Sequence, residues 1–315
     1  MSTETKEFNV KEETKDLLKI VSGFDGTEFK GAYNIREDGG CAGRKSTENI
    51  TIESKEDKPG INIHVKPGTK GENVFIPACI THSGVDDLVY NDFYIGEGAD
   101  VTVIAGCGVH TITEEESRHN GIHRFFIEKN ARVKYVEKHI GTGATKANRF
   151  IDPETDAYLA EGSYLEMDTT QIQGVEKTVR KTRAKLEANA KLVIREKLMT
   201  ADEDTAETDF VVELNGEDCG ADVVSRSVAR GNSRQSFRAR LIGNTRCTGH
   251  SECDAIIADH GSVLSVPELE AYSEDAALIH EAAIGKIAGE QIMKLQTLGL
   301  TEEEAEAKII EGFLR

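Results

Sequence analysis

The side chains best suited to chemistry in this chain gather between Gly249 and Gln291. Within this stretch, Cys253, His280 and Glu281 offer a thiol, an imidazole and a carboxylate, a set that can bind a metal or take part in catalysis. β-rich runs precede His280, and small and apolar residues at helical spacing follow Glu281, so we expect the group near a strand-to-helix junction. The alternative roles are packing, a histidine with satisfied hydrogen bonds, and a carboxylate favoured by the helix dipole.

A second candidate metal site lies upstream. Three Cys-x-x-His pairs occur, at Cys79/His82, Cys107/His110 and Cys247/His250. Because residues i and i+3 of a straight strand point to opposite faces, a turn is needed before such a pair can bind one ion, and Gly106 and Gly108 would permit a turn around Cys107. Cys107, His110 and His123 therefore form a candidate zinc or iron–sulfur site. Its alternative is a buried thiol beside surface imidazoles.

Composition and sequence motifs exclude several classes of function. The chain of 315 residues carries a net charge of −18 and no run of Lys and Arg, which argues against nucleic acid as a partner. No apolar run approaches the roughly 20 residues that span a bilayer, and the polar N-terminus is unlike a signal peptide. Six cysteines without a secretory signal indicate reduced thiols and a cytoplasmic setting. Neither a G-x-x-x-x-G-K-[ST] loop nor a G-x-S-x-G elbow occurs, so nucleotide hydrolysis by this chain is not expected.

A repeat predicts the elements that position these side chains. A small residue at a turn, followed two positions on by a bulky apolar one, recurs at Ala99, Ala131, Gly162, Ala190, Ala221 and Gly261. These positions are 32, 31, 28, 31 and 40 residues apart, and alternating strands such as Val101–Ile104 follow them. A coil of about 30 residues that stacks on copies of itself describes a β-solenoid, with an antiparallel sandwich as the alternative. Because Cys253 and His280 are 27 residues apart, a solenoid would stack them on adjacent coils with Glu281 beside them.

Both ends of the chain read as helical. We expect an N-terminal helical segment over 1–23, with a helix over 4–20, a β-solenoid core over 24–280 and a C-terminal helical hairpin over 281–315. The hairpin either caps the solenoid or docks a partner.

The turn within this hairpin has clear signals. Gly299 suits the left-handed conformation that ends a helix. Thr301 and Glu304 form a capping box that starts the next helix.

Several segments near the C-terminus resemble, in order and spacing, the signature of the SufB/SufD family, the scaffold proteins of SUF-type iron–sulfur cluster assembly. They are Cys253–Ile257, Pro267–Glu270, His280–Ile287, Glu290–Gln291 and Gly299–Ala305. The resemblance is specific from about residue 220 onward. Before residue 220 it rests only on the repeated pattern of small and apolar residues. It implies a mainly β fold, with a β-helix core and a C-terminal helical segment that binds the ABC-type ATPase SufC. A separate ATPase chain agrees with the missing phosphate-binding loop.

The resemblance also implies roles for single residues. Cys253 matches the thiol that takes up sulfur and ligates the nascent cluster in SufB-type members, and Glu281 matches a glutamate of the same members. His280 matches the histidine that SufD-type members contribute across the subunit interface. Because one chain carries all three groups, it is similar to the minimal single-subunit form of the family, which implies a homodimer. It also lacks the long N-terminal region of the usual SufB, which leaves the sulfur donor open.

The resemblance thus implies an assembly scaffold and not an enzyme. The cluster would be transient and of the [4Fe-4S] type, and no nucleotide would bind to this chain. A zinc-binding protein and a metal-free interaction solenoid are the competing hypotheses.

Overall fold

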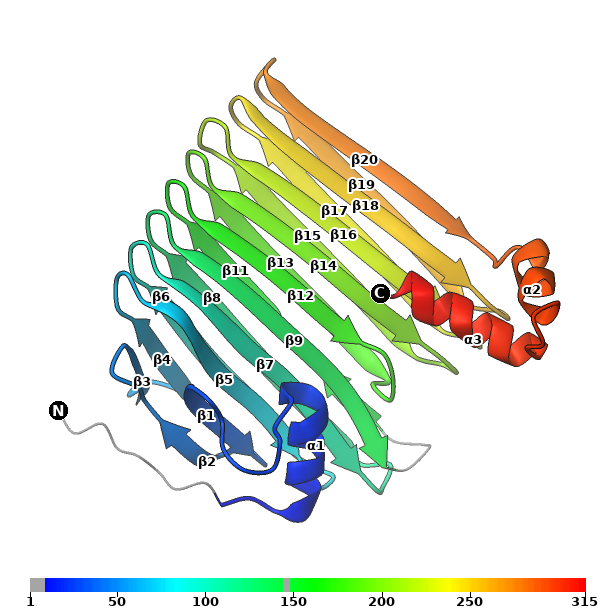
Figure 1. The fold of residues 1–315 in the computed structure, drawn as a ribbon, viewed down its shortest axis with the longest axis horizontal. Helices are drawn as coiled ribbons and strands as arrows, with labels where there is room; N and C mark the ends of the chain where they lie inside the picture. Colours follow the sequence, from blue (N-terminus) through cyan, green and yellow to red (C-terminus); the bar gives the residue numbers. More distant parts are fainter. Residues whose placement is uncertain (1–8, 144–147) are drawn as a thin grey trace.

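The computed structural model describes residues 9–143 and 148–315, which form a long stack of β-strands with helices near both ends (Figure 1). The helices are α1 (Glu12–Ser22), α2 (Gly289–Gln296) and α3 (Glu302–Phe313). The strands are β1 (Ala32–Glu37), β2 (Gly40–Lys45), β3 (Ile50–Ser54), β4 (Gly60–Val65), β5 (Lys70–Ile80), β6 (Asp86–Ile95), β7 (Asp100–Thr111), β8 (Glu116–Ile127), β9 (Arg132–Gly143), β10 (Asn148–Ile151), β11 (Glu154–Leu159), β12 (Tyr164–Gln171), β13 (Lys177–Leu186), β14 (Lys191–Thr200), β15 (Thr205–Leu214), β16 (Gly220–Ala229), β17 (Arg234–Gly243), β18 (Cys247–Ile257), β19 (Ser262–Ala271) and β20 (Ala276–Gly285).

The strands form two sheets, and the chain alternates between them. The first sheet runs β2-β1-β5-β7-β9-β12-β14-β16-β18-β20, and the second runs β19-β17-β15-β13-β10-β8-β6-β4-β3, with β11 between β8 and β13. Pairing is parallel except in the two hairpins β1/β2 and β3/β4. Parallel ladders between strands one coil apart are the pattern of a solenoid and exclude the antiparallel sandwich. The prediction of a β-solenoid core with helical ends is therefore confirmed.

The ladders correct the residues assigned to the repeat. A small residue directly precedes each strand of the first sheet from β7 to β16 and is the first residue of β18 and β20. The aligned set is Ala99, Ala131, Ser163, Ala190, Cys219, Cys247 and Ala276. Gly162 stands one position early, in the turn with φ +68°, and Ala221 stands inside β16. Gly261 belongs to the turn before β19, in the other sheet. Cys219 and Cys247 are thus small residues at the coil corner, where bulk does not fit.

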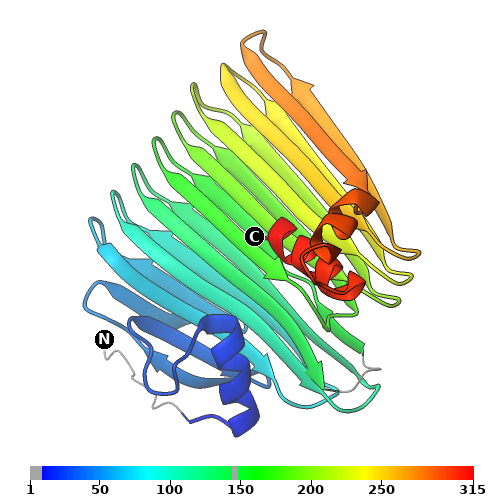
Figure 2. The ribbon, with the colours of Figure 1, turned by 45° about the vertical axis from the view of Figure 1, so that its right-hand side comes forward.

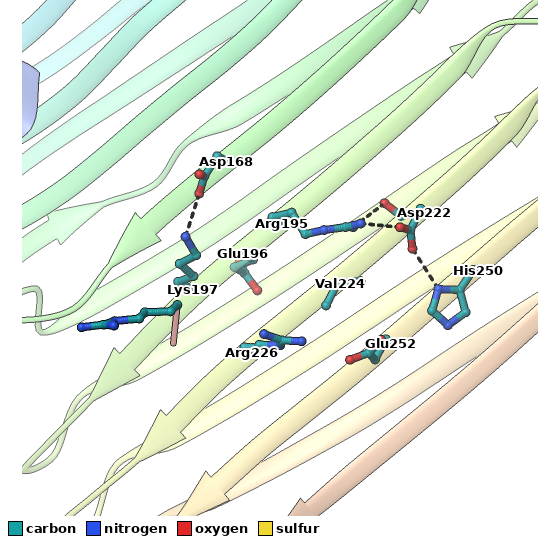
Figure 3. Close-up of a pocket in the computed structure, with 10 residues that line it drawn as sticks. Asp168, Arg195, Glu196, Lys197, Asp222, Val224, Arg226, His250 and Glu252 are labelled. Atoms are coloured by element: carbon teal, nitrogen blue, oxygen red, sulfur yellow. Dashed lines mark hydrogen bonds and ion pairs between the residues drawn. The ribbon is translucent and has the colours of Figure 1, made fainter. Parts of the chain in front are cut away.

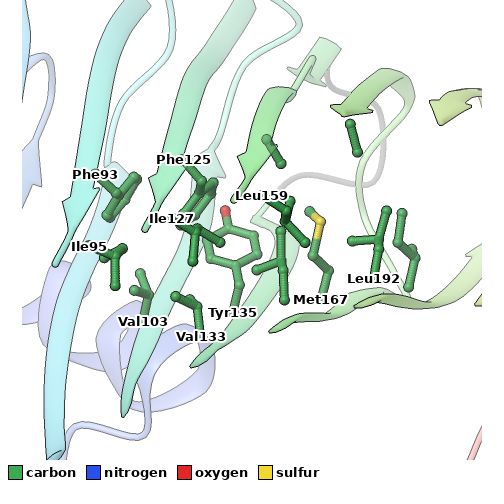
Figure 4. Close-up of a cluster of buried hydrophobic side chains, with 14 of the residues drawn as sticks. Phe93, Ile95, Val103, Phe125, Ile127, Val133, Tyr135, Leu159, Met167 and Leu192 are labelled. Atoms are coloured by element: carbon green, nitrogen blue, oxygen red, sulfur yellow. The ribbon is translucent and has the colours of Figure 1, made fainter. Parts of the chain in front are cut away.

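Like side chains stack from coil to coil in the interior. Phe93 of β6 lies parallel to Phe125 of β8, with ring centroids 4.3 Å apart. Tyr135 of β9 meets Phe125 edge-on at 5.2 Å, across the space between the two sheets (Figure 4). Each stacked aromatic pair adds about 0.5–1.5 kcal/mol beyond its buried area. No single coil has a hydrophobic core of its own. The apolar side chains of neighbouring coils pack on one another, and this packing keeps the strands in register.

The C-terminal hairpin lies along the side of the solenoid. Helix α3 packs Ile310 and Leu314 against Val228 of β16, on the outer face of the first sheet. Figures 1 and 2 show β20 as the final strand at one end of the stack, with the helices folded back from it. The predicted capping box is confirmed, because Thr301 and Glu304 hydrogen-bond each other's backbone N–H. Gly299 has the predicted positive φ, +96°.

Two helix boundaries differ from expectation. α1 covers residues 12–22, so it ends two residues beyond the helix expected over 4–20, whose first residues lie outside the described part of the chain. The helix expected directly after Glu281 begins only at Gly289, because β20 continues to Gly285 as the parallel partner of β18. Residues 282–285 have the spacing of a helix but form a strand, because their backbone hydrogen bonds with β18 on the neighbouring coil stabilise the strand more than a helix. None of the helices in the described part of the chain is both long and apolar enough to cross a membrane.

Candidate functional site

Cys253 lies inside the solenoid, close to its C-terminal end. It belongs to β18, where alternate side chains point inward, and its own side chain is 1% exposed. Burial raises the pKa of this thiol to about 11, against a smaller lowering by the hydroxyl of Ser265 on β19. On β20, the residue paired with Cys253 is Ala282, whose small methyl group covers little of the thiol. A neutral thiol therefore stands one strand from the end of the stack.

His280 lies on the same face of the first sheet as Cys253 but in a different row. Its partner on β18 is Ser251, and the ring Nδ1 is 3.4 Å from the Ser251 hydroxyl oxygen. The predicted stacking of Cys253 on His280 is therefore displaced by two residues, since 29 residues and not 27 separate partners between β18 and β20. The imidazole is half-buried at the edge of the sheet and remains accessible from the solenoid end.

Glu281 points away from both of these groups. It pairs with Glu252 across the β18–β20 ladder, and this row is on the outer face of the sheet because successive strand residues alternate. Its Oε2 atom is 3.7 Å from Nε2 of His250, another outward residue. The prediction that Glu281 sits beside Cys253 and His280 is thus wrong within one chain. The structure brings the thiol and the imidazole to one face and puts the carboxylate on the other.

The solenoid end beyond these residues is uncovered. Leu269 of β19 and Ile284 of β20 continue interior rows, yet 41% and 40% of their surfaces are exposed. β19 and β20 are also the final strands of their sheets, so each has one edge without a partner strand in the described chain. In the described chain, this end therefore exposes apolar side chains together with unpaired strand edges.

A polar network leads into the solenoid from Cys253. The interior row that holds Cys253 continues through Ser225, Glu196, Thr169 and Glu137 on successive strands of the first sheet. The Ser225 hydroxyl donates to Glu196 Oε2 at 2.7 Å. The negative charge of Glu196 contributes to the raised pKa of the thiol.

Arg180 of β13 connects the two buried glutamates. It donates from Nη1 to Glu137 Oε2 at 2.7 Å, and its Nε lies 3.5 Å from Glu196 Oε1. Burial alone would raise the pKa of Glu137, but His139 and Arg180 hold it well below its usual range. Sequence reasoning missed these residues. Their signal is positional, because Glu137 follows Tyr135 and Glu196 follows Ile194 by two residues, which puts each carboxylate on an inward face.

The Cys107, His110 and His123 side chains do not converge. Cys107 is buried in β7, where burial raises its pKa well above the usual range, while Nδ1 of His110 lies 3.0 Å from the Thr142 hydroxyl. His123 is buried with Nδ1 2.8 Å from the Tyr135 hydroxyl and Nε2 3.3 Å from an amide nitrogen. Burial lowers the pKa of His123 to about 4, so its ring is neutral. Within residues 9–143 and 148–315, these three residues do not form a cluster of metal donors.

The glycines beside Cys107 serve helix packing. β7 is continuous from Asp100 to Thr111, so no turn forms at Gly106 or Gly108. A Cβ atom on Gly106 would lie 2.7 Å from Cβ of Val21, and one on Gly108 would lie 3.0 Å from Leu17, both on α1. The missing side chains allow α1 to approach the sheet closely. The expected turn is therefore wrong.

Comparison with known proteins points to one family. Residues 90–313 match the family model described as SUF system FeS cluster assembly, SufBD core domain. Curated proteins described as iron–sulfur cluster assembly SufBD family proteins are similar to this chain. One from Archaeoglobus fulgidus is 29% identical over 275 residues, which cover 86% of this chain and 72% of that protein. One from Methanothermobacter thermautotrophicus is 29% identical over 83% of this chain and 64% of its own length. A third, from Methanocaldococcus jannaschii, is 28% identical over 85% of each chain.

Proposed function

The chain belongs to the SufBD family of iron–sulfur cluster assembly proteins, and on this premise we propose that it is the scaffold on which a nascent cluster is built. Iron and sulfide are cargo in this proposal, and the product is a transient [4Fe-4S] cluster. The observation that carries it is the position of Cys253, an interior thiol one strand from an open end, with His280 on the same face of the edge strand. A shell of mixed donors holds a cluster less firmly than four thiolates and suits later transfer.

Ligation at Cys253 needs a change at the solenoid end. The thiol is protonated near neutral pH because burial raises its pKa to about 11, and only the thiolate binds iron or attacks sulfur. Binding therefore releases a proton, and it requires cargo to pass the edge strand β20. The small Ala282 is the side chain on β20 opposite the thiol. Movement of β20 would uncover the side of Cys253 that faces the solenoid end, which makes this strand the element that a partner has to act on.

A homodimer through the open end would complete the site. Two copies that meet by their β19/β20 ends cover Leu269 and Ile284 and bring Cys253 of one subunit toward His280 of the other. Glu281, on the outer face of the same edge strand, would then approach the site from the side or position iron.

The helical hairpin offers a docking surface for an ABC-type ATPase of the SufC kind. α3 is anchored by Ile310 on the solenoid, whereas α2 buries none of its residues, and Met293 and Leu298 are 58% and 76% exposed. α2 follows β20 after a short connection. A force on α2 would therefore reach the strand that covers Cys253.

Anaerobic reconstitution tests the proposal. Purified protein is incubated with ferrous iron and sulfide, then desalted and examined by visible absorbance and Mössbauer spectroscopy. We expect cluster bands in the wild type and their loss in Cys253→Ser. Equal cluster content in both proteins contradicts the assignment of Cys253.

Metal analysis of protein purified without oxygen separates the competing hypotheses. Iron with acid-labile sulfide supports the scaffold. Zinc without sulfide supports a zinc protein, and a metal-free preparation that also fails to reconstitute supports an interaction solenoid.

A further inference from the structure

We propose that the outer face of β18 and β20 carries a divalent metal site formed by His250, Glu252 and Glu281, and that it holds ferrous iron. One donor atom from each residue lies within 4.8 Å of the others. Glu252 and Glu281 are direct partners across the ladder, and His250 precedes Glu252 by two residues on the same face. One imidazole and two carboxylates on neighbouring strands make a donor set suited to ferrous iron, manganese or zinc.

The imidazole is oriented for a metal by the residues behind it. Nδ1 of His250 lies 2.8 Å from Oδ1 of Asp222, whose other oxygen bonds Arg195 at 2.5 Å (Figure 3). A carboxylate acceptor at Nδ1 places the ring proton there and leaves the lone pair on Nε2. That atom is the one 3.7 Å from Glu281 Oε2. The contact between Asp222 and Nδ1 therefore sets the tautomer that metal binding at Nε2 requires.

The two glutamates repel one another without a cation between them. Like charges directly opposite on neighbouring strands are unfavourable. A divalent ion would neutralise the pair, and Arg226 remains to balance Asp254. His250 and Glu252 also line an open cavity of about 400 Å³, which gives a hydrated ion access (Figure 3).

The position of the site suggests what the iron is for. Glu252 and Cys253 are neighbours in sequence and point to opposite faces of β18, so the site lies directly behind the thiol. Glu281 lies on the edge strand β20, next to Ala282, which faces Cys253. Iron held there would be next to the cluster position before sulfur arrives. The identity of the metal rests on the proposed assembly function, whereas the donor geometry does not.

Equilibrium dialysis of ferrous iron without sulfide, in a Cys253→Ser background, tests the site. We expect one ion per chain, a Mössbauer signature of high-spin ferrous iron with oxygen and nitrogen ligands, and affinity lowered at least about tenfold by His250→Gln or Glu252→Gln. Asp222→Asn should lower affinity about 10- to 100-fold, although Asp222 touches no metal in the proposal. His260→Gln, at an exposed histidine in the turn before β19, is the matched control and should bind like the parent.

The outcomes separate this site from the proposed function. Unchanged iron affinity in both His250→Gln and Glu252→Gln, with unfolding in urea like that of the parent, overturns the site. So does iron whose spectrum shows thiolate ligation or whose binding His260→Gln weakens equally. A wild-type chain that binds iron here but builds no cluster with sulfide contradicts the scaffold proposal and supports the site.

Discussion

Cys253 and His280 lie on adjacent strands and on the same face of a sheet, yet neither is the other's partner. Cys253 pairs with Ala282, and His280 pairs with Ser251. The offset leaves a small residue over the thiol and puts the imidazole at the rim of the solenoid end. We propose that a site joining the two groups is completed between two subunits.

A mixed dimer decides between these geometries. One subunit carries Cys253→Ser and the other carries His280→Ala, with distinct purification tags. A site shared across the two-fold axis keeps one intact pairing, so cluster content should be about half that of the wild-type dimer. Iron and acid-labile sulfide per dimer are measured after reconstitution. Iron close to zero refutes the shared site, because an intrachain site loses both pairings.

Substitution of the exposed face of α2 and its turn should weaken the ATPase complex. Met293→Asp with Leu298→Asp places charges where the proposed partner needs apolar contact, and we expect affinity to fall at least about tenfold. Co-purification and biolayer interferometry with the ATPase measure the effect. The control is Ile112→Asp, at a residue 73% exposed that directly follows β7, several coils away from α2. Full binding by the double variant rejects this surface.

Cys107→Ser should affect cluster yield much less than Cys253→Ser. Cys107 is buried on the inward face of β7, packed with Ala78 and Val109, and its thiol does not meet His110 or His123 in a metal site. Cluster per chain after reconstitution with iron and sulfide is compared in the two variants. An equal loss of cluster in both variants would show that Cys107 is also a cluster ligand.

Glu137→Gln should destabilise the fold by about 3–5 kcal/mol, because it leaves Arg180 buried with its charge incompletely balanced. Urea unfolding followed by circular dichroism measures the free energy. The matched control, Glu161→Gln, removes an exposed pair with Lys129 and should change stability by no more than about 0.5 kcal/mol. Similar losses in both variants would show that the buried network adds nothing beyond a surface pair.

Alkylation of Cys253 should be slow and should accelerate with pH. With a pKa of about 11, roughly one thiol in a thousand is ionised at pH 8, and the ionised fraction rises about tenfold per pH unit below the pKa. The rate of iodoacetamide labelling, read peptide by peptide by mass spectrometry, should follow this slope. Cys41, a half-buried thiol on β2, serves as the internal comparison and should react faster at pH 8. Labelling of Cys253 as fast as Cys41 at that pH contradicts a closed site.

The sequence alone determined the class of fold and the capped turn of the C-terminal hairpin. A repeat of about 30 residues with alternating strands predicts stacked coils, and the capping box at Thr301 starts a helix through contacts only three residues apart. Local patterns of this kind are encoded within a few neighbouring residues, so they can be read without a partner strand.

Register was decided only by the tertiary structure. Coil lengths vary with each turn, and a shift of one or two residues changes which side chains meet, as at Cys253, His280 and Glu281. The ladder with β18 also extended β20 past the expected helix start and put Glu281 opposite Glu252. Contacts between coils come from residues about 30 positions apart, and their free energy depends on packing and burial that no local pattern contains.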